Sequence, residues 1–195
     1  MDSKNAWLKY TNKKDRKMVM EFAEQYRAFL SISKTERECT DFFAAEAEKA
    51  GFKNLDEIIA ENGSVKAGDK VYRTNRGKNI ALFVIGEEPL SKGMNILGAH
   101  IDSPRMDLKQ VPLYEDTEMA FLDTHYYGGI KKYQWVTLPL ALHGVVAKKD
   151  GTVVKVCIGE DIADPVVGVS DLLIHLAADQ MKKTGAKVIE GEDLN

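Results

Sequence analysis

The string "GMNILGAHIDSPR", residues 93–105, ends an apolar run with a histidine and a carboxylate two residues apart. In a β-strand, residues i and i+2 point to the same side, so His100 and Asp102 can project together from a strand's end. A neutral imidazole is a good zinc ligand, and a neighbouring carboxylate can accept the imidazole's other N–H or bind the metal directly. This spacing makes His100 and Asp102 candidates for a metal centre.

The same two residues have an ordinary structural interpretation. A His-x-Asp triplet is common by chance, and a histidine at a strand end is more often a hydrogen-bonded surface residue than a ligand. The other histidines, His125, His143 and His175, stand at no short ligand spacing from His100 or from each other. One histidine and one carboxylate cannot fill a tetrahedral site. Spacing alone therefore favours the surface role.

Helices are expected ahead of this segment. Apolar residues recur at three- and four-residue spacing over residues 15–31, which predicts a helix with one apolar face. A second helix is expected to begin at Thr35 and Glu38, which have capping-box spacing, and to end just before Gly51. Residues 55–59 are also interpreted as a short helix.

Strand patterns surround the candidate residues. Two β-rich runs flanking Asn75-Arg76-Gly77 predict a hairpin, with a strand at residues 80–85. The string "MNILGAH" predicts a strand buried on both faces, with His100 at its end. Residues 140–147 and 152–158 flank an Asp-Gly turn and predict a second hairpin. Helices followed by strands predict a sheet with helices packed on it, and Pro104 marks the expected domain boundary.

Composition limits the function classes. The chain has 195 residues, 44% of them apolar and 29% charged, which allows one large or two small globular domains. The net charge of −3 gives no reason to expect a nucleic acid or membrane partner. No secretory signal or bilayer-spanning run is recognised, and Cys39 and Cys157 form no disulfide framework. These features favour the cytoplasm.

Longer strings add a resemblance to a known family. "GAHIDSPRMDLKQVPLYED", "THYYGGIKKYQWVTLPLALHGVV" and "FFAAEAEKAGF" resemble the M18 metallo-aminopeptidases, most closely the bacterial members of the aspartyl-aminopeptidase-like group. The resemblance implies an enzyme that removes N-terminal residues from peptides through a water activated by two divalent metal ions. Zinc is the expected metal, with cobalt or manganese as alternatives.

The resemblance also implies an α/β fold and an assembly. Residues 1–104 would be the start of an α/β metallopeptidase sandwich. Residues 105–195 would be most of an inserted, mainly β dimerisation domain, which is expected to be incomplete here. Family members form homo-oligomers in which dimers assemble into a tetrahedral dodecamer.

Three residues match functional positions of the family. His100 matches a metal ligand, and Asp102 matches the carboxylate that supports this ligand. His175, in "LLIHL", matches a histidine that reaches the partner subunit's catalytic site and stabilises the tetrahedral intermediate. From the sequence alone, His175 instead has the pattern of a packing residue, because Leu172, Leu173, Leu176 and Ala177 form a helix-like apolar stripe around it.

The other family ligands and the general base are expected downstream of the matched strings. Asp161, Asp164 and the acidic residues 190–193 match no family motif, so the 195-residue chain alone is expected to be inactive. Tyr126 and Tyr127 could line a substrate or subunit surface, but in an antiparallel domain the packing interpretation is favoured. Gly128-Gly129 is interpreted as a backbone turn.

Two competing hypotheses remain. The chain could be a non-catalytic binding or assembly module of the same fold. It could also be a complete mononuclear hydrolase, which would need further ligands from His125, His143, His175 and scattered carboxylates.

Overall fold

The computed structural model describes residues 5–195, so the first four residues of the predicted N-terminal domain lie outside the described chain. The protein divides into two compact units, Met1–Ile101 and Asp102–Asn195. This division falls close to Pro104, where the sequence changes character. The assignment of the units to a catalytic and a dimerisation domain stays a prediction.

The helices of the first unit follow their local sequence signals. They are α1 (Lys13–Ile32), α2 (Glu36–Lys49) and α3 (Leu55–Ala60), preceded by a short 3-10 helix, Ala6–Lys9. The capping box is confirmed, because Thr35 and Glu38 each accept a hydrogen bond from the other's backbone N–H. Gly51 follows the end of α2 with φ +85°, a conformation that glycine adopts without steric cost.

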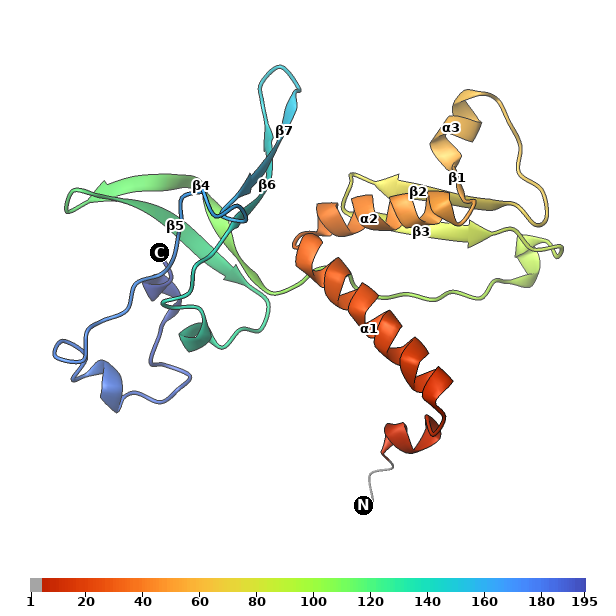
Figure 1. Cartoon of the computed structure of the whole chain (residues 1–195). Coiled ribbons are helices and arrows are strands. Elements are labelled where there is room, and N and C mark those ends of the chain that lie inside the picture. The colour runs from red at the N-terminus through yellow and green to blue at the C-terminus, as the bar shows by residue number, and fades with distance from the viewer. Residues whose placement is uncertain (1–4) are drawn as a thin grey trace. The chain divides into compact units, whose positions relative to one another are not determined.

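A three-stranded sheet completes the regular part of this unit. Its order is β1 (Lys53–Asn54), β2 (Lys70–Asn75) and β3 (Asn79–Val84), and β2 and β3 form the predicted antiparallel hairpin. Helix α2 lies along β2 and β3 (Figure 1).

The buried residues of the first unit lie where α2 meets β2. They are Cys39, Thr40, Ala47, Val71 and Tyr72, together with Ser33 just before α2. The Tyr72 hydroxyl donates a 2.5 Å hydrogen bond to Glu48, which links β2 to α2.

The predicted strand at "MNILGAH" is wrong for this structure. No strand is assigned to residues 93–104 of the described chain, which continue from the 3-10 helix Leu90–Lys92 as extended backbone (Figure 1). Ile96 is 79% exposed and Leu97 is 101% exposed, so the segment is not buried. An apolar run becomes a strand only when a neighbouring strand accepts its backbone hydrogen bonds and covers its side chains. The three strands of the sheet do not include such a neighbour for this segment.

The second unit is built from two antiparallel hairpins. Strands β4 (Arg105–Asp116) and β5 (Met119–Tyr127) pair with an irregularity between Leu108 and Leu113. Strands β6 (Leu142–Ala147) and β7 (Val153–Ile158) form the hairpin predicted around the Asp-Gly turn. The remaining elements are the short 3-10 helices Lys132–Gln134, Gln180–Lys182 and Gly191–Asp193.

The last residues of the chain belong to the core of this unit. Leu194 is 0% exposed and clusters with Val169 and Ile189. The Thr124 hydroxyl on β5 donates to the Leu194 carbonyl, and the Thr124 N–H donates to the Asn195 side chain at 2.9 Å. The string "GEDLN", which has no recognisable element signal, is therefore held against β5 by tertiary contacts. No helix among residues 5–195 is long and apolar enough to cross a bilayer.

Candidate metal centre

His100 lies near the end of the extended segment and is exposed. Its neighbours Ile96 and Leu97 are also exposed, and the backbone that carries the imidazole belongs to no helix or strand of the described residues. The strand-end position predicted for His100 is therefore wrong for this structure. The residue is placed by an irregular segment instead.

Asp102 is held by the second unit. It lies three residues before β4 and is half-buried. Its Oδ2 atom accepts a hydrogen bond of 2.9 Å from the hydroxyl of Tyr127, the last residue of β5. The carboxylate is thus attached to the open end of the β4–β5 hairpin, which restricts its orientation.

The types of donor fit zinc, but their number does not complete a site. Imidazole nitrogen and carboxylate oxygen both belong to the usual zinc ligand set, and a structural or catalytic site takes three or four protein ligands. Within residues 5–195, no group of three or more His, Cys, Asp and Glu side chains is arranged to hold a metal ion. His100 and Asp102 can therefore supply only part of a coordination sphere.

The other histidines of the strands have local partners. His125 on β5 stacks on Tyr126 with ring centroids 5.9 Å apart. His143 on β6 lies with its Nε2 atom 3.0 Å from Glu160. Because these two histidines belong to different hairpins and join no ligand cluster of the described residues, the structure gives no support to a complete mononuclear site.

Two acidic residues outside the candidate centre, Asp164 and Glu190, make structural hydrogen bonds. Asp164 accepts hydrogen bonds from the backbone N–H groups of Gly159 and Asp161, which closes a turn. Glu190 accepts a hydrogen bond from the Lys183 ammonium at 3.0 Å, and this contact lowers the pKa of the Glu190 carboxyl. The lowered pKa of Glu190 is the opposite of the raised carboxyl pKa that is useful in a general base.

His175 is exposed, and the helix-like stripe predicted around it is wrong. Residues 174–176 form a turn. Only Ala177 of the predicted stripe is buried, at 2% exposure. The large apolar side chains beside His175 are exposed, namely Leu172 (54%), Leu173 (71%), Ile174 (67%) and Leu176 (71%). The turn therefore presents His175 within an apolar surface and does not bury it.

The sequence favours a packing role for Tyr127, whereas in the structure its hydroxyl is hydrogen-bonded to Asp102. The "YYGGI" string marks both Tyr126 and Tyr127, and it gives no indication of a carboxylate partner 25 residues before Tyr127. That contact depends on the pairing of β4 with β5.

The protein matches a known family along most of its length. Residues 29–193, which include His100, Asp102 and His175, match the profile of "Aminopeptidase I zinc metalloprotease (M18)". The chain is 61% identical over 192 residues to the "Probable M18 family aminopeptidase 1" of Clostridium acetobutylicum. That match covers 98% of this chain but 41% of the relative, so the chain spans less than half of the relative's length.

Solved structures agree with the sequence match. Aminopeptidase I from C. acetobutylicum superimposes with a TM-score of 0.82 at 61% identity, covering 98% of this chain and 42% of that chain. The M18 aminopeptidase from Thermotoga maritima gives a TM-score of 0.85 at 39% identity, covering 100% and 41%. The S. cerevisiae mApe1 dodecamer gives 0.61 at 24% identity, covering 77% and 36%, which shows a shared fold alone.

Proposed function

The chain belongs to the M18 family of zinc metalloproteases, and from this premise we propose that it is part of an aminopeptidase that removes N-terminal residues from peptides. The observation that carries this proposal is the 61% identity to an M18 aminopeptidase over 98% of the chain. An α/β polypeptide with a mainly β second unit is consistent with a metallopeptidase sandwich followed by an inserted dimerisation domain.

His100 is proposed as a metal ligand and Asp102 as its support. The imidazole would bind zinc through one nitrogen, and the carboxylate would accept the N–H of the other, which fixes the tautomer and ring orientation. Two ions are proposed, with cobalt or manganese as alternatives to zinc. Bound zinc polarises a peptide carbonyl and lowers the pKa of water. The remaining ligands and the general base are proposed to come from polypeptide that this chain does not contain.

His175 is proposed to act across a dimer interface. It lies on an exposed turn between large apolar side chains, and contiguous exposed apolar surface is typical of protein–protein contacts. A second copy of the protein is the proposed occupant of this surface. An imidazole N–H brought into the partner's site could donate to the developing oxyanion of the tetrahedral intermediate. Assembly of such dimers into a tetrahedral dodecamer is part of the same proposal.

The proposed location is the cytoplasm. Cys39 and Cys157 are both free thiols, as is usual in a reducing compartment. Peptides with a free amino terminus are the proposed substrates.

The proposal can be tested with a family-length chimera, in which this chain is joined to the part of the C. acetobutylicum relative that it does not cover. We expect the chimera to bind zinc and to release N-terminal residues from peptides in a metal-dependent manner. The 195-residue chain alone should show no turnover. A chimera that folds but neither binds zinc nor releases N-terminal residues would favour the alternative of a non-catalytic assembly module. Turnover by the chain alone, with its mass verified, would contradict the expectation that it is incomplete.

A further inference from the structure

The contact between Tyr127 and Asp102 links the end of β5 to the segment that precedes β4. The Tyr127 hydroxyl donates to Asp102 Oδ2 at 2.9 Å, although 25 residues separate the two in sequence. A tyrosine hydroxyl has one proton to donate, and a carboxylate accepts it along a defined lone-pair direction. The contact therefore restricts rotation of the Asp102 side chain.

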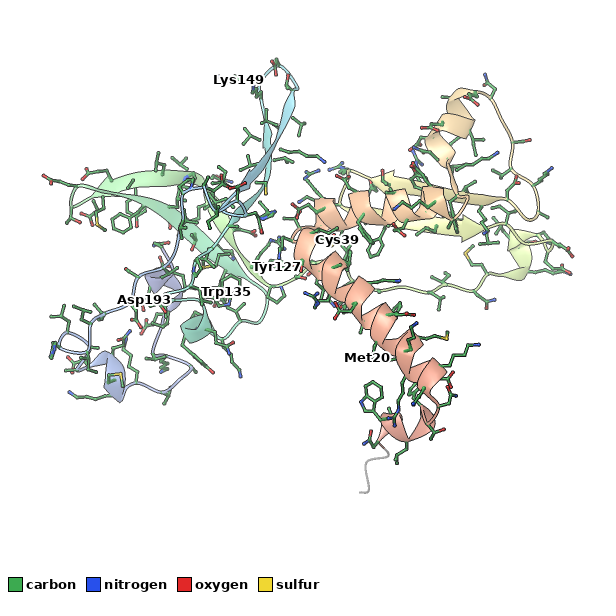
Figure 2. All side chains as sticks on the ribbon, viewed as in Figure 1. Met20, Cys39, Tyr127, Trp135, Lys149 and Asp193 are labelled. Atoms are coloured by element: carbon green, nitrogen blue, oxygen red, sulfur yellow. The ribbon has the colours of Figure 1, made fainter. Side chains whose placement is uncertain are left out.

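The Tyr127 ring is itself held from the opposite strand. Arg105 is its direct partner in the antiparallel register, and the Arg105 guanidinium carbon lies 4.3 Å from the centroid of the Tyr127 ring. This is a cation–π contact. The guanidinium is fixed in turn by a 2.7 Å hydrogen bond from its Nε to Asp107 Oδ1. Tyr127, which is labelled in Figure 2, therefore donates to Asp102 from a ring that has the Arg105 guanidinium over one face.

The residue after Tyr127 brings the same two segments together. Gly128 has φ +78°, and a β-carbon at this position would lie 3.4 Å from the Pro104 ring and 3.5 Å from its α-carbon. Glycine thus allows the left-handed turn, and the turn brings the chain to ordinary van der Waals distance from Pro104. The "YGG" string and the "DSP" string are parts of one local structure.

We propose that Tyr127 is a positioning residue for the candidate metal centre, and that Arg105 clamps its ring for this purpose. The inference rests on the proposed function, because it takes Asp102 to be the support of a metal-binding His100. A carboxylate orients an imidazole only when its own rotation is restricted. Tyr127 supplies this restriction by occupying Oδ2, so that the carboxylate keeps one orientation relative to the start of β4.

Tyr126 provides a matched control. It is adjacent in sequence, it is 38% exposed where Tyr127 is 39% exposed, and successive residues of a strand point to opposite faces. Its ring stacks on His125 and lies 5.4 Å from the Lys132 ammonium. Tyr126→Phe and Tyr127→Phe therefore remove the same hydroxyl from two similar surface positions, and only Tyr127 is bonded to Asp102 through it.

The first test uses the 195-residue chain labelled for NMR. Tyr127→Phe should shift the Asp102 carboxyl carbon resonance, whereas Tyr126→Phe should leave it unchanged. In the family-length chimera, Tyr127→Phe should weaken zinc binding about tenfold, within the range for groups that hold a metal ligand's partner. Tyr126→Phe should change it less than twofold. Zinc affinity is measured by competition with a chromophoric chelator.

A double-mutant cycle separates positioning from a general structural role. If Tyr127 acts through Asp102, Tyr127→Phe should have no further effect on zinc affinity in an Asp102→Asn background. The inference would be overturned if the two substitutions together weakened zinc affinity by the product of their separate effects. It would also be overturned if the Tyr127→Phe protein bound zinc as tightly as the Tyr126→Phe protein. The His100→Ala variant distinguishes a failure of the proposed function from a failure of the positioning role of Tyr127. Unchanged zinc binding in that variant contradicts the proposed function itself, whereas lost binding confines the failure to Tyr127.

Discussion

The two residues proposed for the metal centre lie in differently built regions. Asp102 is held at the open end of the β4–β5 hairpin by Tyr127, whose ring is covered by Arg105. His100 belongs to an extended segment whose apolar side chains are exposed, with Leu97 at 101%. The difference shows that one half of the candidate site is oriented by elements of this chain. The other half lies on a segment that belongs to no helix or strand of the described residues.

His175 resembles His100 in this respect. It lies on an exposed turn among exposed leucines, and no regular element of the described chain encloses it. Both histidines with proposed chemical roles are therefore carried by segments with exposed apolar side chains, whereas the carboxylate of Asp102 is hydrogen-bonded to Tyr127.

The largest expected effect comes from removing His100, which lies on the extended segment. In the family-length chimera, His100→Ala should remove at least one zinc equivalent per chain and most of the peptidase activity, because a ligand of the metal is lost. Zinc content is measured by atomic emission on protein whose fold is checked by circular dichroism. His125→Ala, which changes an exposed histidine on β5, is the matched control. Full zinc and full turnover in folded His100→Ala would remove His100 from the site.

His175→Ala should lower kcat by about 10²–10³, the cost of losing a donor to an oxyanion, with zinc content unchanged. Co-expression with His100→Ala should restore some activity, because a mixed dimer contains one site in which both histidines are intact. Turnover of verified mixed dimers is compared with that of each parent. Mixed dimers no more active than the parents would show that His175 does not act across the interface.

Asp102→Asn tests the ordered half of the site. The amide keeps the shape of the carboxylate but loses its charge, so zinc affinity or activity should fall by about 10–100-fold while the fold is kept. Asp116→Asn, at the far end of the same hairpin, should leave both unchanged. The measurements are chelator competition and steady-state kinetics. If zinc affinity and activity changed by no more than about twofold, well below the range for groups that support a metal ligand, Asp102 would have no role beyond the hairpin contact.

The smallest effect compares two tyrosine–carboxylate contacts. Tyr72 is 4% exposed, and its hydrogen bond to Glu48, followed by its burial, raises its pKa to about 12. The unfolded chain would lose this proton near the ordinary value of about 10. The contribution of this contact to stability is therefore fully present below pH 10 and is lost as the pH rises from about 10 to about 12.

Glu48→Gln should bring the pKa of Tyr72 back toward its ordinary value, because the hydrogen bond to a carboxylate is the largest cause of the shift. Phenolate absorbance, with Tyr72→Phe used to assign the signal, measures the titration. The same pKa for Tyr72 in both proteins would show that burial alone causes the shift.

Local sequence signals determined much of the first unit. The capping box at Thr35, the glycine after α2 and the turn at Arg76-Gly77 act over a few residues, so they favour a helix end or a hairpin with little dependence on distant contacts. The Asp-Gly hairpin of the second unit has the same origin. The family was also recognisable from strings around His100 and Tyr127, because these strings are specific even without a structure.

Only the tertiary structure decided how the candidate site is held. An apolar run such as "MNILGAH" has the composition of a buried strand, but it pairs only if a neighbour is present, and this condition cannot be read from the run itself. The apolar residues around His175 have helical spacing but form a turn. The contact of Tyr127 with Asp102, and the burial of Leu194 against Val169, join residues far apart in the chain. Such contacts follow from strand pairing and packing, to which local propensity contributes little.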